Sequence, residues 1–477
     1  MNRWIGSCVA CAVLGGCAVG PDFAPPAPPK APGYSATPIV SRMAPGSGEP
    51  AQRLVRGSEV PRQWWKAFGS PALNAVVAEA IEGSPTIEAA RTRLAAAQDL
   101  VRAARGGYYP QIDAGAFAAR QKGPPFAAGL LQPRPVPTYD LYSVGPTVSF
   151  VPDVFGSTAR HVEEQSALEE QQRDELAAAR LAVAGNAVAQ AFAIASNRMQ
   201  LEAIDGIVAD DEKTLALTWQ KFDAGKVDRG EVLAAQARLE TDRTAAPPLE
   251  QQLSAARDAL AALLGRSPGA WAAPDFALDE FTLPAELPVR IPSELVRRRP
   301  DIRAAQAQLH ASSAAIGVAT GRLYPTIVLS GAIEPAALTP GVLFDRQNLD
   351  WNLLAGITAP IFHGGTLRAQ RDAAVDTFRS TLALYREVVL QSFRQVADIL
   401  HALSHDAELV RGERRALDAS RADRDLARQR YATGKTDLIR LLDVQRSVEQ
   451  ARVGYARARA QRDLDSAALY VALGGGE

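Results

Sequence analysis

An internal repeat constrains the fold of this chain more than any other feature. The phrase "YATGKTDLIRLLDVQ" (431–445) matches "FDAGKVDRGEVLAAQ" (222–236), with an aromatic residue, Gly, Lys, Asp, Leu and Gln at shared positions. A second matching pair, "SPTIEAARTRLAAAQDLVRAARGGYYP" (84–110) and "RPDIRAAQAQLHASSAAIGVATGRLYP" (299–325), extends the similarity toward the start of each copy. Such self-similarity identifies a tandem duplication. We predict repeat 1 over residues 61–265, a connecting segment over 266–298, and repeat 2 over 299–477.

The N-terminus has the layout of an export signal. Arg3 precedes a short apolar run that ends in "LGGC", with Cys17 as its last residue. A run of this length is typical of a signal peptide and too short to span a bilayer. We predict a lipoprotein signal peptide over 1–16, with acylation (palmitate) on Cys17; an ordinary signal peptide with an incidental Cys is the alternative. Residues 17–60 are rich in Pro and are expected to form an extended tether that does not pack.

Each repeat contains two segments in which apolar and polar residues alternate. In "TIVLSGAIE", Ile327, Leu329 and Ile333 occupy one face. The alternation predicts strands at about 109–120, 140–153, 324–334 and 348–360. Strands of this length suit a tilted transmembrane β-strand, although a soluble antiparallel sheet has the same pattern. Aromatic residues near the strand ends favour the membrane. Four strands cannot close a barrel, so several copies must combine.

Long helices are expected to follow the strands. Residues 156–223 and 365–433 contain no Pro and are rich in Ala, Leu, Gln, Glu and Arg, all strong helix formers. Each helix could reach roughly 100 Å. We predict a helix over 300–321 and long hairpins over 156–265 and 365–473, with reversals at Gly225 and Gly434. Apolar residues of the second hairpin recur at the coiled-coil period of about 3.5, at Val375, Phe378, Leu382, Tyr385, Val389, Phe393, Val396, Leu400 and Leu403.

Composition and motifs argue against catalysis and nucleic-acid binding. The formal net charge is −1, whereas general nucleic-acid binders carry a concentrated basic surface. His401 and His405 are spaced like helical metal ligands, but no third ligand accompanies them. We therefore expect no enzymatic activity, no cofactor and no metal site.

Several phrases resemble one known family. They are "RQWWKAFGSPALNAVVAEAI", "ELVRRRPDIRAAQAQL", "IGVATGRLYP", "APIFHGGTLRA" and the two repeated phrases at 222–236 and 431–445. Over nearly the whole mature chain the sequence resembles outer-membrane efflux lipoproteins, the channel components of tripartite drug pumps related to the TolC family. The resemblance implies an α+β membrane protein with the trimeric TolC-like fold. In that fold, four strands from each protomer form a shared twelve-strand barrel, which continues into a long periplasmic α-helical coiled-coil barrel.

The resemblance also implies a function and its partners. It implies a homotrimeric exit duct, lipid-anchored in the outer membrane of a Gram-negative bacterium and contacting its lipid, that confers antibiotic resistance. An inner-membrane pump of the resistance-nodulation-division type would drive export, and a periplasmic membrane-fusion adaptor would dock at the helical tips. The matching tip positions are Gly225, Lys226, Val227 and Asp228 in the first copy and Gly434, Lys435, Thr436 and Asp437 in the second.

The family's periplasmic gate maps onto the second copy. The matching carboxylate is Asp443, with Ile439 at the apolar constriction and with Arg430 and Arg446 as partners for neighbouring helices. The first copy has Ala234 where the second has Asp443, so this carboxylate departs from the repeat. The alternative for Asp443 is an ordinary exposed side chain.

Two other functions remain open at the level of sequence. One is a lipid-anchored periplasmic coiled-coil scaffold without a pore, which the alternating strands disfavour. The other is the outlet of a type I protein secretion system, which the same fold serves and which the lipid anchor disfavours.

Overall fold

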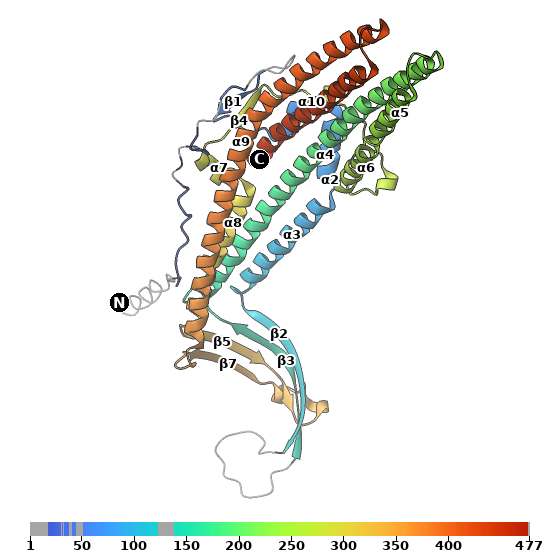
Figure 1. The fold of residues 1–477 in the computed structure, drawn as a ribbon. Helices are drawn as coiled ribbons and strands as arrows, with labels where there is room; N and C mark the ends of the chain where they lie inside the picture. The colour runs from blue at the N-terminus through green and yellow to red at the C-terminus, as the bar shows by residue number, and fades with distance from the viewer. Residues whose placement is uncertain are drawn as a thin grey trace. The chain divides into compact units, whose positions relative to one another are not determined.

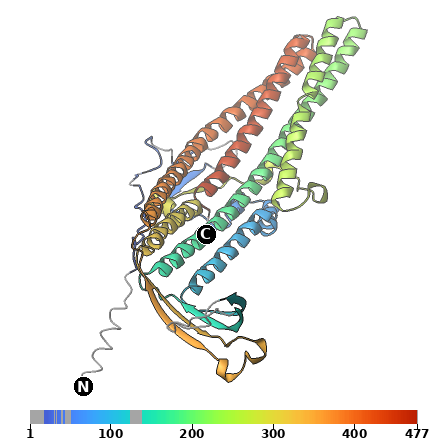
Figure 2. The ribbon, with the colours of Figure 1, turned by 90° about the horizontal axis from the view of Figure 1, so that it is seen from below.

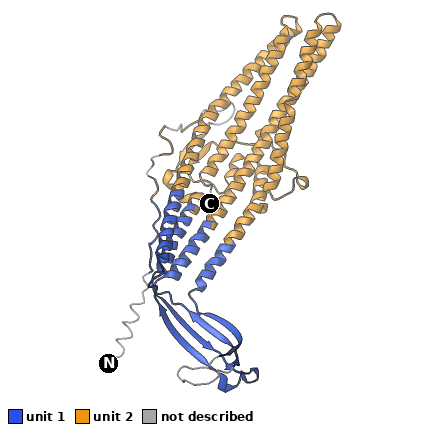
Figure 3. Ribbon diagram, turned by 60° about the horizontal axis from the view of Figure 1, so that its bottom comes forward, with its two compact units in different colours: residues 1–26, 95–171, 305–385 blue, residues 27–94, 172–304, 386–477 orange. Residues whose placement is uncertain are grey.

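The structure is a computed structural model that describes residues 18–29, 31, 33–37, 41–43, 51–122 and 138–475. The predicted signal peptide and Cys17 lie outside these residues. The chain divides into two compact units (Figure 3). Unit 1 comprises residues 1–26, 95–171 and 305–385, and unit 2 comprises residues 27–94, 172–304 and 386–477.

Unit 1 contains an antiparallel sheet whose main strands run in the order β2-β3-β5-β7 (Figure 1). The strands are β2 (Gln111–Lys122), β3 (Thr138–Phe150), β5 (Thr326–Ile333) and β7 (Trp351–Thr358). β2 begins two residues later than expected because Tyr109 N donates to Gly106 O in a turn that precedes Pro110. A two-residue strand that the alternation did not predict, β6 (Ala336–Ala337), also pairs with β3.

The sheet exposes many large apolar side chains in the single chain. This is more apolar surface than a soluble monomer usually leaves uncovered. The exposed large apolar residues on the four main strands are Ile112, Phe117, Val148, Leu329, Ile333, Trp351, Leu353, Leu354 and Ile357.

Helices account for most of the remaining chain. α4 (Ser157–Asp223) and α9 (Thr366–Ala432) each contain 67 residues. In unit 2, α5 (Arg229–Arg243) runs back beside α4, and α10 (Leu438–Ala472) runs back beside α9 (Figures 1 and 2). We call α4–α5 the first hairpin and α9–α10 the second hairpin. The other helices are α2 (Pro71–Gly83), α3 (Pro85–Gly106), α6 (Ala246–Leu263), α7 (Pro292–Arg298) and α8 (Pro300–Gly321).

The apolar stripe of α9 forms the buried side of this helix. Tyr385, Val389, Val396, Leu400 and Leu403 are buried. The same spacing continues to Ala407, Val410 and Leu417, which are also buried. The coiled-coil period read from the sequence therefore identifies the packing face correctly.

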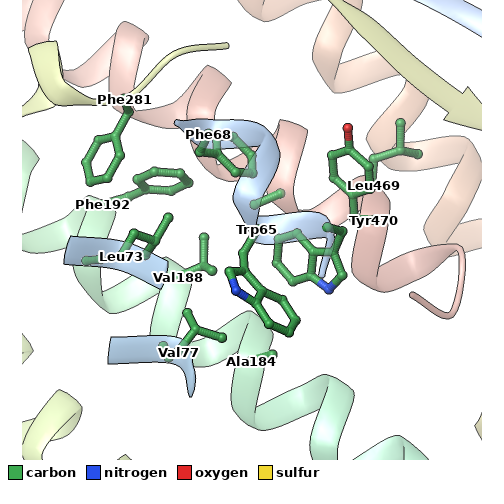
Figure 4. Close-up of a cluster of buried hydrophobic side chains, with 14 of the residues drawn as sticks. Trp65, Phe68, Leu73, Val77, Ala184, Val188, Phe192, Phe281, Leu469 and Tyr470 are labelled. Carbon is green, nitrogen blue, oxygen red and sulfur yellow. The ribbon is translucent and has the colours of Figure 1, made fainter. Parts of the chain in front are cut away.

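Aromatic side chains fill the core of unit 2 (Figure 4). Phe68, from the 3-10 helix η1 (Trp64–Phe68), meets Phe192 of α4 edge to face at 5.1 Å between ring centroids. Trp64 stacks on Tyr470 of α10 at 5.6 Å. The "WW" pair of the sequence is thus a packing feature, because Trp64 and Trp65 are both buried.

The expectation that residues 17–60 form a tether without packing is wrong. In unit 2, β1 (Arg53–Arg56) pairs in parallel with β4 (Glu286–Val289), and Tyr34 Oη donates to Arg290 O at 2.8 Å. In unit 1, a Cβ added to Gly20 would come within 2.5 Å of Gly317 Cα. Proline content predicts the absence of helix, but partners distant in sequence decide whether an extended segment packs.

Candidate functional site

The two tips use the same backbone device to end one helix and begin the next. At the first tip, Lys226 N donates to Lys221 O at 2.8 Å and Gly225 N donates to Phe222 O at 2.8 Å. At the second tip, Lys435 N donates to Arg430 O at 2.8 Å and Gly434 N donates to Tyr431 O at 3.1 Å. This pair of bonds is the Schellman motif, which needs a left-handed residue. Gly225 and Gly434 supply it, with φ of 69° and 73°.

An aspartate caps the helix that leaves each tip. Asp228 Oδ1 accepts from Glu231 N at 3.0 Å, and Asp437 Oδ1 accepts from Arg440 N at 2.9 Å. These carboxylates are engaged within the chain, although the sequence placed them among the docking residues. Lys226 and Lys435 are exposed and Val227 and Thr436 are half-buried, so these side chains and the backbone form the tip surface that is not used for capping.

The predicted gate residues lie around the second tip. Ile439, Asp443 and Arg446 are exposed on α10, and Ile439 is 65% exposed. The opposite face of α10 is buried: Leu441 and Val444 pack with Ala235 of the first hairpin. Arg430 is exposed in the last turn of α9. The structure therefore gathers Ile439, Asp443 and Arg446 on the face of α10 that is turned away from the first hairpin.

Within the described part of this single chain, no ion pair joins Asp443 to Arg430 or Arg446. The backbone carbonyl of Asp443 accepts a hydrogen bond from Ser447 Oγ at 3.0 Å. Near the second tip, α10 is instead joined to α9 by Arg440, whose Nη2 donates to Asp423 Oδ2 at 2.9 Å.

The structure shows links between the two hairpins that the sequence did not predict. Lys221 Nζ lies 3.3 Å from the centroid of the Tyr431 ring, a cation–π contact. Gln445 Nε2 of α10 donates to Thr214 Oγ1 of α4 at 3.3 Å, and Arg238 Nη2 of α5 donates to Glu449 Oε2 of α10 at 2.8 Å.

Differences between the two repeats would have pointed to several of these residues. At the offset of the tip phrases, Arg238 corresponds to Ser447 and Asp211 corresponds to Ser420. Arg238 and Asp211 therefore differ from their counterparts in the other repeat, as Asp443 differs from Ala234. A difference alone, however, does not tell which residue it contacts.

The histidine pair does not form a metal-binding cluster in the structure. His401 Nε2 lies 3.1 Å from Ser35 Oγ, and His405 is exposed. Across the residues that the structure describes, no group of three or more His, Cys, Asp or Glu side chains has an arrangement suited to a metal ion.

Known proteins match the chain over nearly its whole length. The sequence profile of the family "Outer membrane efflux protein" matches residues 76–266 and 291–475. The chain is 31% identical to the pyoverdine export outer membrane protein OpmQ of Pseudomonas aeruginosa, over 87% of each protein. It is also 31% identical to the outer membrane protein OprJ of Pseudomonas aeruginosa, over 97% of this chain and 94% of OprJ.

Solved structures match the fold. The outer-membrane channel OprN superimposes with a TM-score of 0.86 and 28% identity, over 96% of this chain and 99% of OprN.

Proposed function

The chain belongs to the outer membrane efflux protein family, and on that basis we propose that three copies form a channel gated at the second tip. Members of this family are outer-membrane channels of Gram-negative bacteria that work as trimers with adaptor and pump partners. The chain is therefore the outer-membrane channel component of a tripartite efflux system, and it extends into the periplasm. This function replaces the scaffold and protein-secretion alternatives left open by the sequence.

The open edges of the sheet support assembly from several copies. β2 and β7 lie at the two ends of the strand order, and neither has a partner on its outer side among the described residues. Unpaired backbone groups are costly in hydrocarbon, so a lipid-exposed sheet must close. Pairing β7 of one copy with β2 of the next would close it and leave apolar side chains facing lipid.

Exposure of Ile439, Asp443 and Arg446 on one face of α10 is the observation that carries the gate proposal. If this face lines the pore, a trimer brings three Asp443 carboxylates together. Such a ring attracts cations and repels anions, and a ring of Ile439 adds an apolar constriction. Arg430 and Arg446 would then pair with carboxylates of neighbouring copies and hold the ring closed.

The tips are the proposed docking surface for the periplasmic adaptor. Six equivalent turns would surround a trimer, two from each copy. Because Asp228 and Asp437 cap helices, we assign recognition to the backbone at Gly225 and Gly434 and to the side chains of their neighbours. These side chains are Lys226, Val227, Lys435 and Thr436. An inner-membrane pump of the resistance-nodulation-division type completes the proposed assembly.

The proposed lipid anchor on Cys17 adjoins a segment that is held firmly in unit 1. Val19 N donates to Phe155 O at 3.1 Å, and the buried Arg160 donates to Val19 O and to Asp22 Oδ1. This segment would hold an acyl group on Cys17 near the start of α4, which follows β3.

The gate is tested by Asp443→Ala in planar bilayers. Removing three carboxylates and their ion pairs should raise the single-channel conductance and sensitise cells to large antibiotics. Asp425→Ala is the matched control, because it removes an exposed carboxylate of α9 that already pairs with Arg424 of its own chain.

An unchanged conductance in Asp443→Ala would remove this residue from the gate. Fractionation of the wild-type protein with the inner membrane, or loss of its heat-modifiable trimer, would contradict the assembly itself.

A further inference from the structure

A cluster of four charged side chains, two of them buried and two half-buried, joins the first hairpin to α10. Asp211 lies on α4, Arg238 and Asp242 lie on α5, and Glu449 lies on α10. Arg238 Nε is 2.6 Å from Asp242 Oδ2 and 3.9 Å from Asp211 Oδ2, and Arg238 Nη2 donates to Glu449 Oε2 at 2.8 Å. Glu449 follows Asp443 by less than two helical turns. The cluster therefore holds the part of α10 that carries the proposed gate.

The charges of this cluster do not balance. Three carboxylates surround one guanidinium, so the fully ionised cluster carries two uncompensated negative charges. Asp211 is 2% exposed and Asp242 is 5% exposed, and water therefore stabilises neither charge. An unpaired charge in such a position is strongly unfavourable.

A proton would satisfy the hydrogen bonds of the cluster. The Asp211 and Asp242 carboxyl groups lie within hydrogen-bonding reach of each other. Their buried Oδ2 atoms accept no hydrogen bond, and Arg238 Nε, although 2.6 Å from Asp242 Oδ2, does not donate one to it. Ionised carboxylates only accept hydrogen bonds, whereas a protonated carboxyl donates one. One proton on this pair would supply the missing donor and remove one surplus charge.

Among the residues that the structure describes, Arg238 is the one cation that acts on Asp211. The groups that act on it are Asp242, Arg238 and Glu449. Arg446 of α10 acts on Glu449. The remaining charges nearby are engaged elsewhere: Asp210 with Lys213 and with Arg428 of α9, and Glu212 and Glu240 with Arg243.

We propose that Arg238, Asp211, Asp242 and Glu449 form a proton-dependent latch between the first hairpin and α10. With a proton bound, the latch holds α10 against the first hairpin. Without it, repulsion among the carboxylates weakens this contact. The consequence for permeation rests on the gate proposed above, because the latch would restrain the helix that bears Asp443.

The pH range of the latch follows from the burial of Asp211. Burial, together with the neighbouring Asp242, raises the pKa of Asp211 from 3.8 to about 7. Burial also raises the pKa of Glu449. Because the pKa of Asp211 is higher in the closed latch than in the open one, its stabilisation is complete at acidic pH and is lost as the pH rises through about 7.

Hydrogen–deuterium exchange of the full-length channel tests the latch directly. After correction for intrinsic exchange rates, the amides of 441–449 should be about tenfold better protected at pH 6 than at pH 8, as linkage through a pKa near 7 requires. Asp211→Asn, which stays neutral, should give the same protection at both pH values. Asp242→Asn should also give equal protection at both pH values. It replaces Asp211→Asn in the test if that variant fails to assemble.

Asp406→Asn is the matched control. Burial also raises the pKa of Asp406, but its neighbour is Asp465 and it lies outside the latch. The tenfold difference at 441–449 should persist in this variant. A wild-type protein without the difference, or one in which both latch variants keep it, would overturn the proposal.

Conductance separates the latch from the gate. If exchange at 441–449 depends on pH in the wild type but not in Asp211→Asn, while Asp443→Ala leaves conductance unchanged, the gate assignment fails and the latch stands. If Asp443→Ala opens the channel while exchange is independent of pH, the latch fails and the gate stands.

Discussion

At the scale of single residues, aspartate has three roles near the tips, and its surroundings decide which role applies. Asp228 and Asp437 each accept a backbone N–H and cap a helix. Asp443 is exposed, whereas Asp211 and Asp242 are buried beside one arginine. In the sequence all five are aspartates, and nothing in their residue type distinguishes one from another. Only the local contacts separate a cap from a candidate gate or a proton-binding pair.

The cap at the second tip makes a testable contribution to stability. Asp437→Ala removes the acceptor for Arg440 N and should cost about 1 kcal/mol, as lost N-caps do. Exchange of the amides at the start of α10 should accelerate by about fivefold, which is the population change for that free energy. Asp437→Asn keeps a capping oxygen and should remain close to wild type; equal acceleration in both variants would argue against the cap.

At the scale of elements, α9 is stabilised along one side. Its buried stripe includes Val396 and Leu400. Leu384, Leu390 and Leu409 of the same helix are exposed in the single chain, and their spacing does not place all three on one side of the helix. Singly exposed apolar side chains are usual on protein surfaces. The buried stripe, and not these leucines, is therefore expected to stabilise the hairpin.

Substitutions in the buried stripe of α9 and at its exposed positions should lower the free energy of unfolding by different amounts. Leu400 is 1% exposed, so Leu400→Ala should cost about 2–5 kcal/mol by leaving a cavity. Leu384 is 58% exposed, and Leu384→Ala should cost much less. Thermal unfolding followed by the helical circular dichroism signal compares them; similar transition temperatures would mean that the stripe does not stabilise the hairpin.

At the scale of the whole molecule, the sheet is incomplete without other copies. Its edge strands β2 and β7 come from different repeats, so the duplication supplies both ends of a repeating contact. A head-to-tail contact of this kind closes into a ring when the rotation between copies allows it. The trimer of the family is the closed form of that arrangement.

Cross-linking tests the contact between β2 and β7. A cysteine at Ala116 of β2, combined in turn with one at each position from 352 to 357 of β7, should give covalent trimers for the positions in register. Cysteines at Asp113 and Thr147, which pair within one chain, should cross-link without joining copies. Absence of covalent oligomers across the whole scan would contradict the closed sheet.

Much of the fold follows from local patterns in the sequence. Alternation gave the four main strands, and the 3.5-residue period gave the packing face of α9. The repeated Gly-Lys phrase located both turns. These features depend on residues within a few positions of one another, and their periodicity shows directly which side of an element is buried.

Sequence reasoning failed where partners are far apart in the chain. β1 and β4 pair across more than two hundred residues, and the sequence "RLVR" does not predict which strand it will pair with. For the same reason the N-terminal segment was expected to remain unpacked. Asp211 and Glu449 also lie far apart in sequence, and their meeting depends on how two hairpins pack.

The sequence by itself determined the duplication, the order of helices and strands, the turns at the tips and the family. Only the tertiary structure decided which charges are buried together, which aspartates are used as caps, and which face of α10 remains exposed at Ile439 and Asp443. The reason is physical. Secondary structure depends on neighbours along the chain, whereas burial, and with it the cost of a charge, depends on neighbours in space.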